Sequence, residues 1–148
     1  MKKLNLALIL LVVFFQSCNS DDCGDCFTPP ENFRFELVDK SSRENVFSNG
    51  TFNQNQIKIT NMLNNSPAEF KFISENEINL IQINGIGFQT ETIRLQIDLG
   101  NTPVFNFYVD AERKKEDCCS FTEFKDINIT NSDFELDPQT GVYRILVE

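Results

Sequence analysis

Hydrophobic and polar residues alternate along much of the chain after about residue 32. The clearest run covers residues 93–99, where isoleucine and leucine alternate with arginine, glutamine and aspartate. Residues 33–37 and 57–60 show the same period of two. Since successive side chains of a β-strand point to opposite faces, this period predicts half-buried strands. No window of about 12 residues in the mature chain shows a convincing period of 3.6, so we expect little helix.

Turn-forming residues separate these runs. Gly100-Asn101-Thr102 is expected to join residues 93–99 to residues 104–109 in a hairpin, followed by a charged connection over residues 110–117. The alternation slips at Leu80-Ile81, which indicates a bulge or a strand buried on both faces. Seven to nine short strands at this spacing predict an all-β fold. We expect one antiparallel β-sandwich, immunoglobulin-like or transthyretin-like, over residues 32–148.

The first residues follow a different pattern. Two lysines precede an apolar run over residues 6–15, and Ser17-Cys18 follows it. The run is about half the length of roughly 20 residues that a membrane-spanning helix needs, so a secretion signal is favoured over a spanning helix. A cysteine at this place indicates a bacterial lipoprotein signal, with residues 1–17 removed and Cys18 lipidated. Phe15 and Gln16 depart from the usual motif, so an ordinary signal peptide with an unrelated cysteine is the alternative.

Residues 18–31 form a predicted tether, because they are polar and acidic and contain Pro29-Pro30. Ser20, Asp21 and Asp22 resemble the acidic export signal of surface-exposed lipoproteins of Bacteroidota; a plain polar spacer is the alternative. This resemblance implies a protein held in the outer membrane by the diacylglyceryl and acyl (palmitate) groups on Cys18. The outer face of that membrane is favoured over the periplasmic face.

Short motifs of the body are similar to those of the same group. Residues 35–40, 44–47 and 57–59 resemble the opening strands of small uncharacterised lipoproteins of Bacteroidota, and residues 141–145 resemble their last strand. The resemblance implies a β-sandwich. It carries over no activity and no site residue.

Charge and composition exclude several classes of function. The chain has 22 acidic and 13 basic residues, and this balance argues against nucleic acid or an anionic membrane surface as a partner. It contains no histidine, which is the commonest general base and metal ligand. No nucleophile or phosphate-binding motif is present. We therefore expect no enzyme activity and no cofactor.

Four cysteines remain once Cys18 is set aside: Cys23, Cys26, Cys118 and Cys119. An even number in an exported domain favours disulfides. A bond between the neighbours Cys118 and Cys119 needs a strained ring, so we expect Cys23 and Cys26 to pair with Cys118 and Cys119. A redox-active Cys-x-x-Cys pair, a zinc site and free thiols are the alternatives.

Acidic residues offer two weaker candidate sites. Asp133, Glu135 and Asp137 would share one face of a strand and are weak calcium candidates, although charged side chains on an edge strand are the ordinary interpretation. A hydrolase would need two acids, drawn from Glu75, Glu77, Glu91 and Asp98, to converge in a cleft.

These observations favour a non-enzymatic surface lipoprotein that acts as a binding or accessory module of an envelope complex. A carbohydrate-binding module, calcium-assisted or not, is the alternative. It is weakened by the absence of tryptophan and the presence of only two tyrosines, Tyr108 and Tyr143. A carboxylate-based hydrolase is the third hypothesis.

Overall fold

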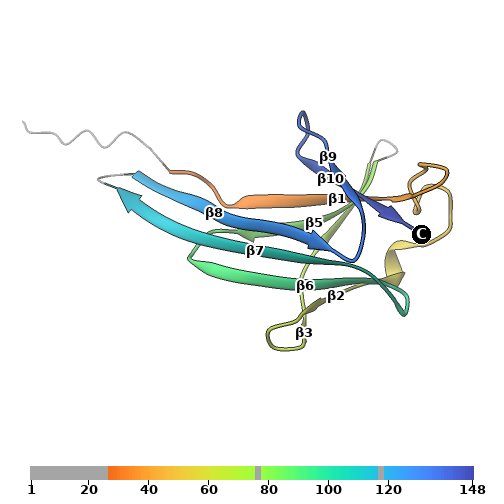
Figure 1. Cartoon of the computed structure of the whole chain (residues 1–148), viewed down its shortest axis with the longest axis horizontal. Coiled ribbons are helices and arrows are strands. Elements are labelled where there is room, and N and C mark those ends of the chain that lie inside the picture. Colours follow the sequence, from red (N-terminus) through yellow and green to blue (C-terminus); the bar gives the residue numbers. More distant parts are fainter. Residues whose placement is uncertain (1–26, 76–77, 117–118) are drawn as a thin grey trace, which may run out of the picture.

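The computed structural model describes residues 27–75, 78–116 and 119–148, and this part of the chain forms a two-layer β-sandwich (Figure 1). Its elements are β1 (Glu31–Asp39), the 3₁₀-helix η1 (Gln54–Gln56), β2 (Ile57–Asn61), β3 (Ser66–Pro67), β4 (Lys71–Glu75), β5 (Ile78–Ile86), β6 (Glu91–Leu99), β7 (Thr102–Glu116), β8 (Cys119–Thr130), β9 (Phe134–Leu136) and β10 (Val142–Val147). The first sheet has the order β4-β5-β1-β10-β9 and the second the order β3-β2-β6-β7-β8. The all-β sandwich is confirmed. Over the described residues, no helix is long and apolar enough to span a membrane.

Two details of the prediction were wrong. Ten strands form in the described part of the chain instead of seven to nine, because β3 has only two residues and leaves no alternation to detect. One pair is parallel: β1 runs alongside β10, from Arg34 opposite Val142 to Asp39 opposite Val147. Alternation reports which side chains are buried, but it does not report strand direction. A pairing between the two ends of the domain is therefore invisible to it.

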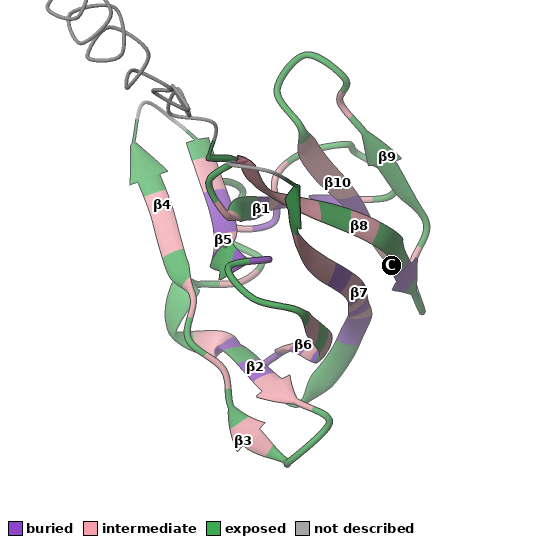
Figure 2. Ribbon diagram, turned by 90° about the vertical axis from the view of Figure 1, so that its left-hand side faces the viewer, coloured by how far each residue is buried: buried purple, intermediate pink, exposed green. Residues whose placement is uncertain are grey.

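The core lies between the two sheets, where the alternating apolar residues meet (Figure 2). Phe35 of β1 is fully buried, and its ring centroid lies 5.2 Å from that of Phe105 and 4.9 Å from that of Phe107. Burial of a phenylalanine side chain contributes about 1.5–3 kcal/mol, and a tilted ring pair adds about 0.5–1.5 kcal/mol. Phenylalanines of β1 and β7 thus hold the two layers together.

Strand β5 is buried on both faces where the alternation slips. Leu80 is 8% exposed and Ile81 is fully buried, although neighbouring residues of a strand point in opposite directions. Ile81 belongs to the core between the sheets, and Asn79 is hydrogen-bonded to the loop that follows β1. The sequence predicted either a bulge or a strand buried on both faces, and the structure shows the strand buried on both faces.

The hairpin between residues 93–99 and 104–109 is confirmed as β6 and β7, but the charged connection after it was wrong. Strand β7 continues to Glu116 and pairs with β8 along its length. Ala111 faces the core and is fully buried, so this charged segment still places an apolar residue on the inner face of the sheet. Its charges form cross-strand pairs, Lys114 with Glu123 and Lys125 with Glu112, and such pairs stabilise neighbouring strands.

Candidate functional site

Most residues of the predicted anchor and cross-link lie outside the described residues. These are Cys18, Ser20, Asp21, Asp22, Cys23, Cys26 and Cys118. Lipidation, export and the choice of disulfide partners therefore stay predictions. Cys119 begins β8 and is disulfide-bonded.

The chain enters the domain along the first residues of β8. Phe27 forms a parallel bridge with Ser120, and the backbone amide of Thr28 donates a hydrogen bond of 2.9 Å to the carbonyl of Ser120. Two residues of the predicted tether thus pair with a strand from the far end of the sequence. We call Phe27, Thr28, Arg113, Ser120 and Thr122 the tether clasp.

Arg113 of β7 is the central side chain of the tether clasp. Its guanidinium donates to the carbonyl of Thr28 at 2.9 Å, to Thr122 Oγ1 at 2.8 Å and to the carbonyl of Ser120 at 3.2 Å. It also lies over the ring of Phe27, 4.7 Å from the centroid. Arginine suits this place because its planar group donates in several fixed directions and stacks on aromatic rings. Within the described residues Arg113 forms no ion pair, so its role here is to join segments.

The turn between β5 and β6 is attached to the same cluster. Thr122 donates a 2.5 Å hydrogen bond to the carbonyl of Gly87, and the amide of Arg113 donates a 3.0 Å bond to Thr90 Oγ1. Gly87 has φ +89°, and a Cβ atom there would lie 2.6 Å from Thr122 Cγ2. The left-handed backbone and the close approach both require glycine. The tether clasp therefore joins three segments that are distant in sequence.

Each of the three calcium candidates has another partner in the structure. The Asp133 carboxylate lies 3.3 Å from Lys40 Nζ, and the Asp137 carboxylate accepts from the amide of Gln139 at 2.8 Å in a turn. The hydrogen bond from Gln139 is the main cause that lowers the pKa of Asp137. In the part of the chain that the structure describes, no group of three or more potential metal ligands occurs.

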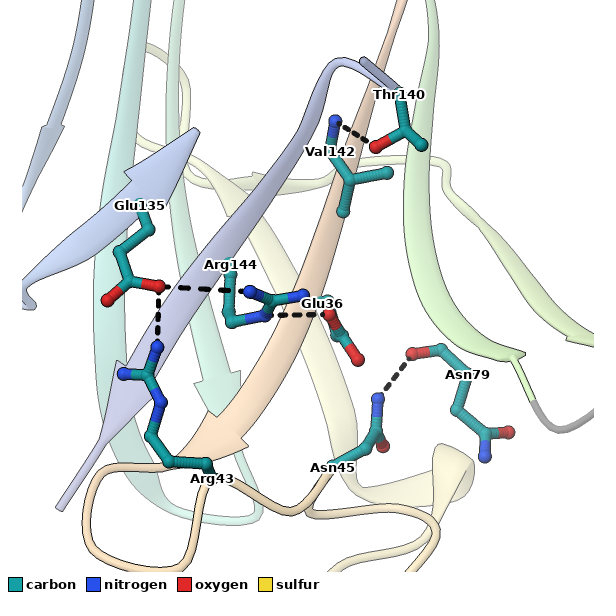
Figure 3. A network of polar contacts seen from close by, with 8 residues as sticks. All are labelled: Glu36, Arg43, Asn45, Asn79, Glu135, Thr140, Val142 and Arg144. Carbon is teal, nitrogen blue, oxygen red and sulfur yellow. Dashed lines mark hydrogen bonds and ion pairs between the residues drawn. The ribbon is translucent and has the colours of Figure 1, made fainter. Parts of the chain in front are cut away.

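Glu135 belongs to a charged network on the outer face of the first sheet (Figure 3). Its carboxylate lies 2.5 Å from Arg43 and 3.8 Å from Arg144, which in turn lies 3.0 Å from Glu36. The hydrogen bond from Arg43 is the main cause that lowers the pKa of Glu135. Because these side chains are largely exposed, solvent screens the pairs and each contributes little to stability. The network connects β1, β9 and β10.

Two of the candidate hydrolytic acids, Glu91 and Asp98, are far apart. Glu91 and Asp98 stand at the two ends of β6, and a strand of that length separates them by about 23 Å. Glu75 ends β4 at an edge of the other sheet, and Glu77 lies outside the described residues. A pair of catalytic carboxyl groups in a glycosidase is about 5–10 Å apart. Glu91 and Asp98 do not form such a pair.

The two tyrosines occupy different environments. Tyr143 is partly buried and packs against Phe33 and Phe35 of the core, and this burial raises its pKa. Tyr108 lies on the outer face of the second sheet, because its neighbours along β7 are buried on the inner face. The guanidinium of Arg94 lies 5.3 Å from its ring centroid, and Asn128 is its partner on β8.

The outer face around Tyr108 is polar. The next pair along the same two strands places Asp110 opposite Asp126, and the pair on the other side places Asn106 opposite Thr130. Hydroxyl, amide and carboxylate groups therefore surround one half-buried aromatic ring.

Comparison of the chain with protein-family models, curated proteins and solved structures finds no match.

Proposed function

We propose that this chain is a lipid-anchored, non-enzymatic module that binds a partner or serves as an accessory subunit of an outer-membrane complex, on the outer face of that membrane. The observation that carries the proposal is the tether clasp. Its contacts begin at Phe27, nine residues after the predicted lipidation site at Cys18. Contacts this close to the anchor keep the whole folded domain near the membrane surface. A scaffold or accessory subunit of a membrane complex needs such a position.

The cross-pairing of cysteines is part of the same proposal. Phe27 and Ser120 are parallel neighbours, and the residues that precede them in the sequence are Cys26 and Cys119. This register supports a disulfide from Cys26 or Cys23 to Cys119 or Cys118. Such a bond closes a loop of roughly 90 residues and stabilises the fold by about 4–5 kcal/mol in the chain-entropy account. It would make the tether clasp covalent.

The proposal of a non-enzymatic role is supported by the chemistry of the described residues. The chain lacks histidine, and Glu91 and Asp98 are too far apart to act as a catalytic pair. For the fold we propose an immunoglobulin-like or transthyretin-like sandwich, supported by two five-stranded sheets packed face to face.

The test is a cross-linking pull-down of the full lipidated protein from intact cells. The matched control is Cys18→Ala, which removes the predicted anchor and leaves the sandwich unchanged. We expect an envelope protein that is captured repeatedly by the anchored form and lost in the control. No captured protein in repeated experiments, or equal capture by both forms, would contradict an accessory role at the membrane.

A carbohydrate-binding role is the second candidate, and one observation favours it. Tyr108 is a partly exposed aromatic ring on the polar outer face of the second sheet, next to the acidic pair Asp110 and Asp126. Sugars commonly stack on such rings while polar groups bind their hydroxyls. A glycan screen with the full chain tests it: Tyr108→Ala should weaken binding roughly tenfold, which corresponds to the upper end of an aromatic contact. An equal loss in Asn101→Ala, at the distant β6–β7 turn, would indicate a non-specific effect.

A further inference from the structure

Exposed phenylalanines gather at the end of the sandwich where the chain enters. Phe88, in the turn between β5 and β6, is 67% exposed, the largest value for a large apolar side chain among the described residues. Phe27, at the entry, is 56% exposed. Both side chains belong to segments that the tether clasp holds. We call this the tether end; Figure 1 shows the start of β1 and the end of β7 on the side of the molecule opposite the C label.

A chain of contacts through Arg113 and Thr122 places the two phenylalanines on the same end. Arg113 lies over the Phe27 ring and donates a hydrogen bond to the hydroxyl of Thr122. That hydroxyl donates to the carbonyl of Gly87, the residue before Phe88. Because the carbonyl of Gly87 accepts this hydrogen bond, the turn that carries Phe88 is attached to the tether clasp. Two rings held on a rigid end differ from single apolar residues scattered over a surface, which need no explanation.

We propose that the tether end lies against the lipid bilayer, with Phe27 and Phe88 in the interface between headgroups and acyl chains. This inference rests on the proposed lipid anchor and adds an orientation to it. The occupant is a bilayer surface with phosphate headgroups. Phenylalanine is among the side chains that interfacial segments bury at the boundary between headgroups and acyl chains.

Chain length limits how far the tether end can be from the anchor. Nine residue steps separate Cys18 from Phe27, and a fully extended chain of that length spans at most about 30 Å. Any disulfide that joins the tether to β8 shortens this distance. The tether end is therefore the part of the domain that meets the bilayer first.

Charge at the tether end also permits this contact. The chain as a whole carries a formal charge of −9, which an anionic lipid surface would repel. At the end of β7, however, Lys114 is neutralised by Glu123, whereas Lys115 forms no ion pair within the described residues. Lys115 is exposed beside the exposed Glu116, and we expect Lys115 to be the group at this end that binds a lipid phosphate. The sequence-based argument against an anionic membrane surface concerns the net charge of the whole chain, whereas this proposal concerns one end of the domain.

The absence of tryptophan provides a clean test. In the full lipidated chain, Phe88→Trp introduces a single fluorophore at the tether end, and Phe134→Trp places one on β9, where the native ring is 42% exposed. Both proteins are reconstituted in vesicles of phosphatidylcholine and phosphatidylglycerol, with plain or brominated acyl chains. Bromine quenches only rings that reach the acyl boundary.

We expect the tryptophan at position 88 to lose about half of its emission in brominated vesicles, as a ring at interfacial depth should, and the tryptophan at position 134 to keep it. Lys115→Glu, combined with Phe88→Trp, should reduce this quenching in anionic vesicles and leave it unchanged in neutral ones. Thermal unfolding of each variant checks that the domain remains folded.

Flotation of the vesicles separates the two proposals. If the protein floats and position 88 is not quenched, the anchor stands and the contact of the tether end with lipid is wrong. Equal quenching at both positions overturns the stated orientation. If the protein does not float, the anchor itself fails, and this inference fails with it.

Discussion

The guanidinium carbon of Arg113 lies 4.7 Å from the ring centroid of Phe27, so a side chain of β7 covers the first described residue of the chain. The same group donates to the carbonyl of Thr28. Arg113 therefore connects the entry of the chain to the two longest strands of the second sheet. Its removal should loosen the entry without disturbing the core between the sheets.

Replacement of Arg113 by lysine tests the tether clasp. Lysine retains the charge but lacks the planar fork that reaches three acceptors, so we expect a loss of about 1–3 kcal/mol in the free energy of unfolding. Hydrogen exchange at the Thr28 amide should become faster. Arg94→Lys is the matched control, because Arg94 stacks on Tyr108 at a different place. Unchanged exchange at Thr28 would show that Arg113 does not hold the entry.

Gly87→Ala tests the close approach of the β5–β6 turn to Thr122. Gly50 has a similar backbone, with φ +79°, but a Cβ atom there meets nothing within 4 Å. Gly50→Ala should therefore cost about 1–2 kcal/mol for backbone strain alone, and Gly87→Ala about 3 kcal/mol, since overpacking adds to the strain. Denaturant unfolding measures both. Equal losses would mean that the contact with Thr122 contributes nothing.

Phe35→Ala tests the contact between the layers. The residue is fully buried against Phe105 and Phe107, so truncation leaves a cavity and should cost about 3–5 kcal/mol. Phe134→Ala removes a ring that is 42% exposed and should cost about 1 kcal/mol or less. Comparable losses in the two variants would contradict the assignment of the core.

The network around Glu135 predicts a loss of stability in acid. Its pKa in the folded state lies below the ordinary value of about 4.5, mainly because of Arg43. The unfolded chain therefore takes up this proton first. The stabilisation is complete above the ordinary pKa and is lost as the pH falls through the lowered one. Glu135→Gln should make the decrease in thermal midpoint between pH 7 and pH 3 smaller.

The control for this effect is Glu69→Gln, an exposed residue that takes part in no ion pair of the described residues. Its pH profile should match that of the parent protein. Because the Glu135 network is solvent-exposed, high salt should also weaken the difference between Glu135→Gln and the parent. A profile for Glu135→Gln that is identical to the parent would mean that the network does not contribute to stability.

The positions of the core strands could be predicted because alternation is a local property. Residues 93–99 alternate strictly, and Leu95, Ile97 and Leu99 are buried as expected. The parallel pairing of β1 with β10 could not be predicted, since it depends on how the chain ends pack. Charges misled the interpretation of residues 110–117, because cross-strand ion pairs and one buried alanine accompany a strand over residues 110–116.

The tether clasp was missed for the same reason. In the sequence, Arg113 is one of several charged residues in a row, and nothing nearby indicates that it contacts Phe27. One signal was present: Arg113 stands two positions after Ala111 and four after Val109, in phase with the inward-facing residues of β7. An arginine in that phase needs acceptors, and the tether and β8 provide them.

Peptide mapping without reduction tests the proposed cross-link. We expect peptides in which Cys23 or Cys26 is joined to Cys118 or Cys119, as the register of Phe27 with Ser120 suggests. Reduction should then speed up hydrogen exchange at Thr28 as well as lower the thermal midpoint. A peptide that joins Cys23 to Cys26 would contradict cross-pairing and favour a local pair.

The most direct measurement is mass spectrometry of the N-terminal peptide of the mature protein, isolated from membranes. We expect a mature chain that begins at Cys18 and carries a diacylglyceryl and an acyl group on that residue. A mature chain that begins elsewhere, or that carries an unmodified Cys18, would contradict the lipid anchor on which both the proposed function and the orientation of the tether end depend.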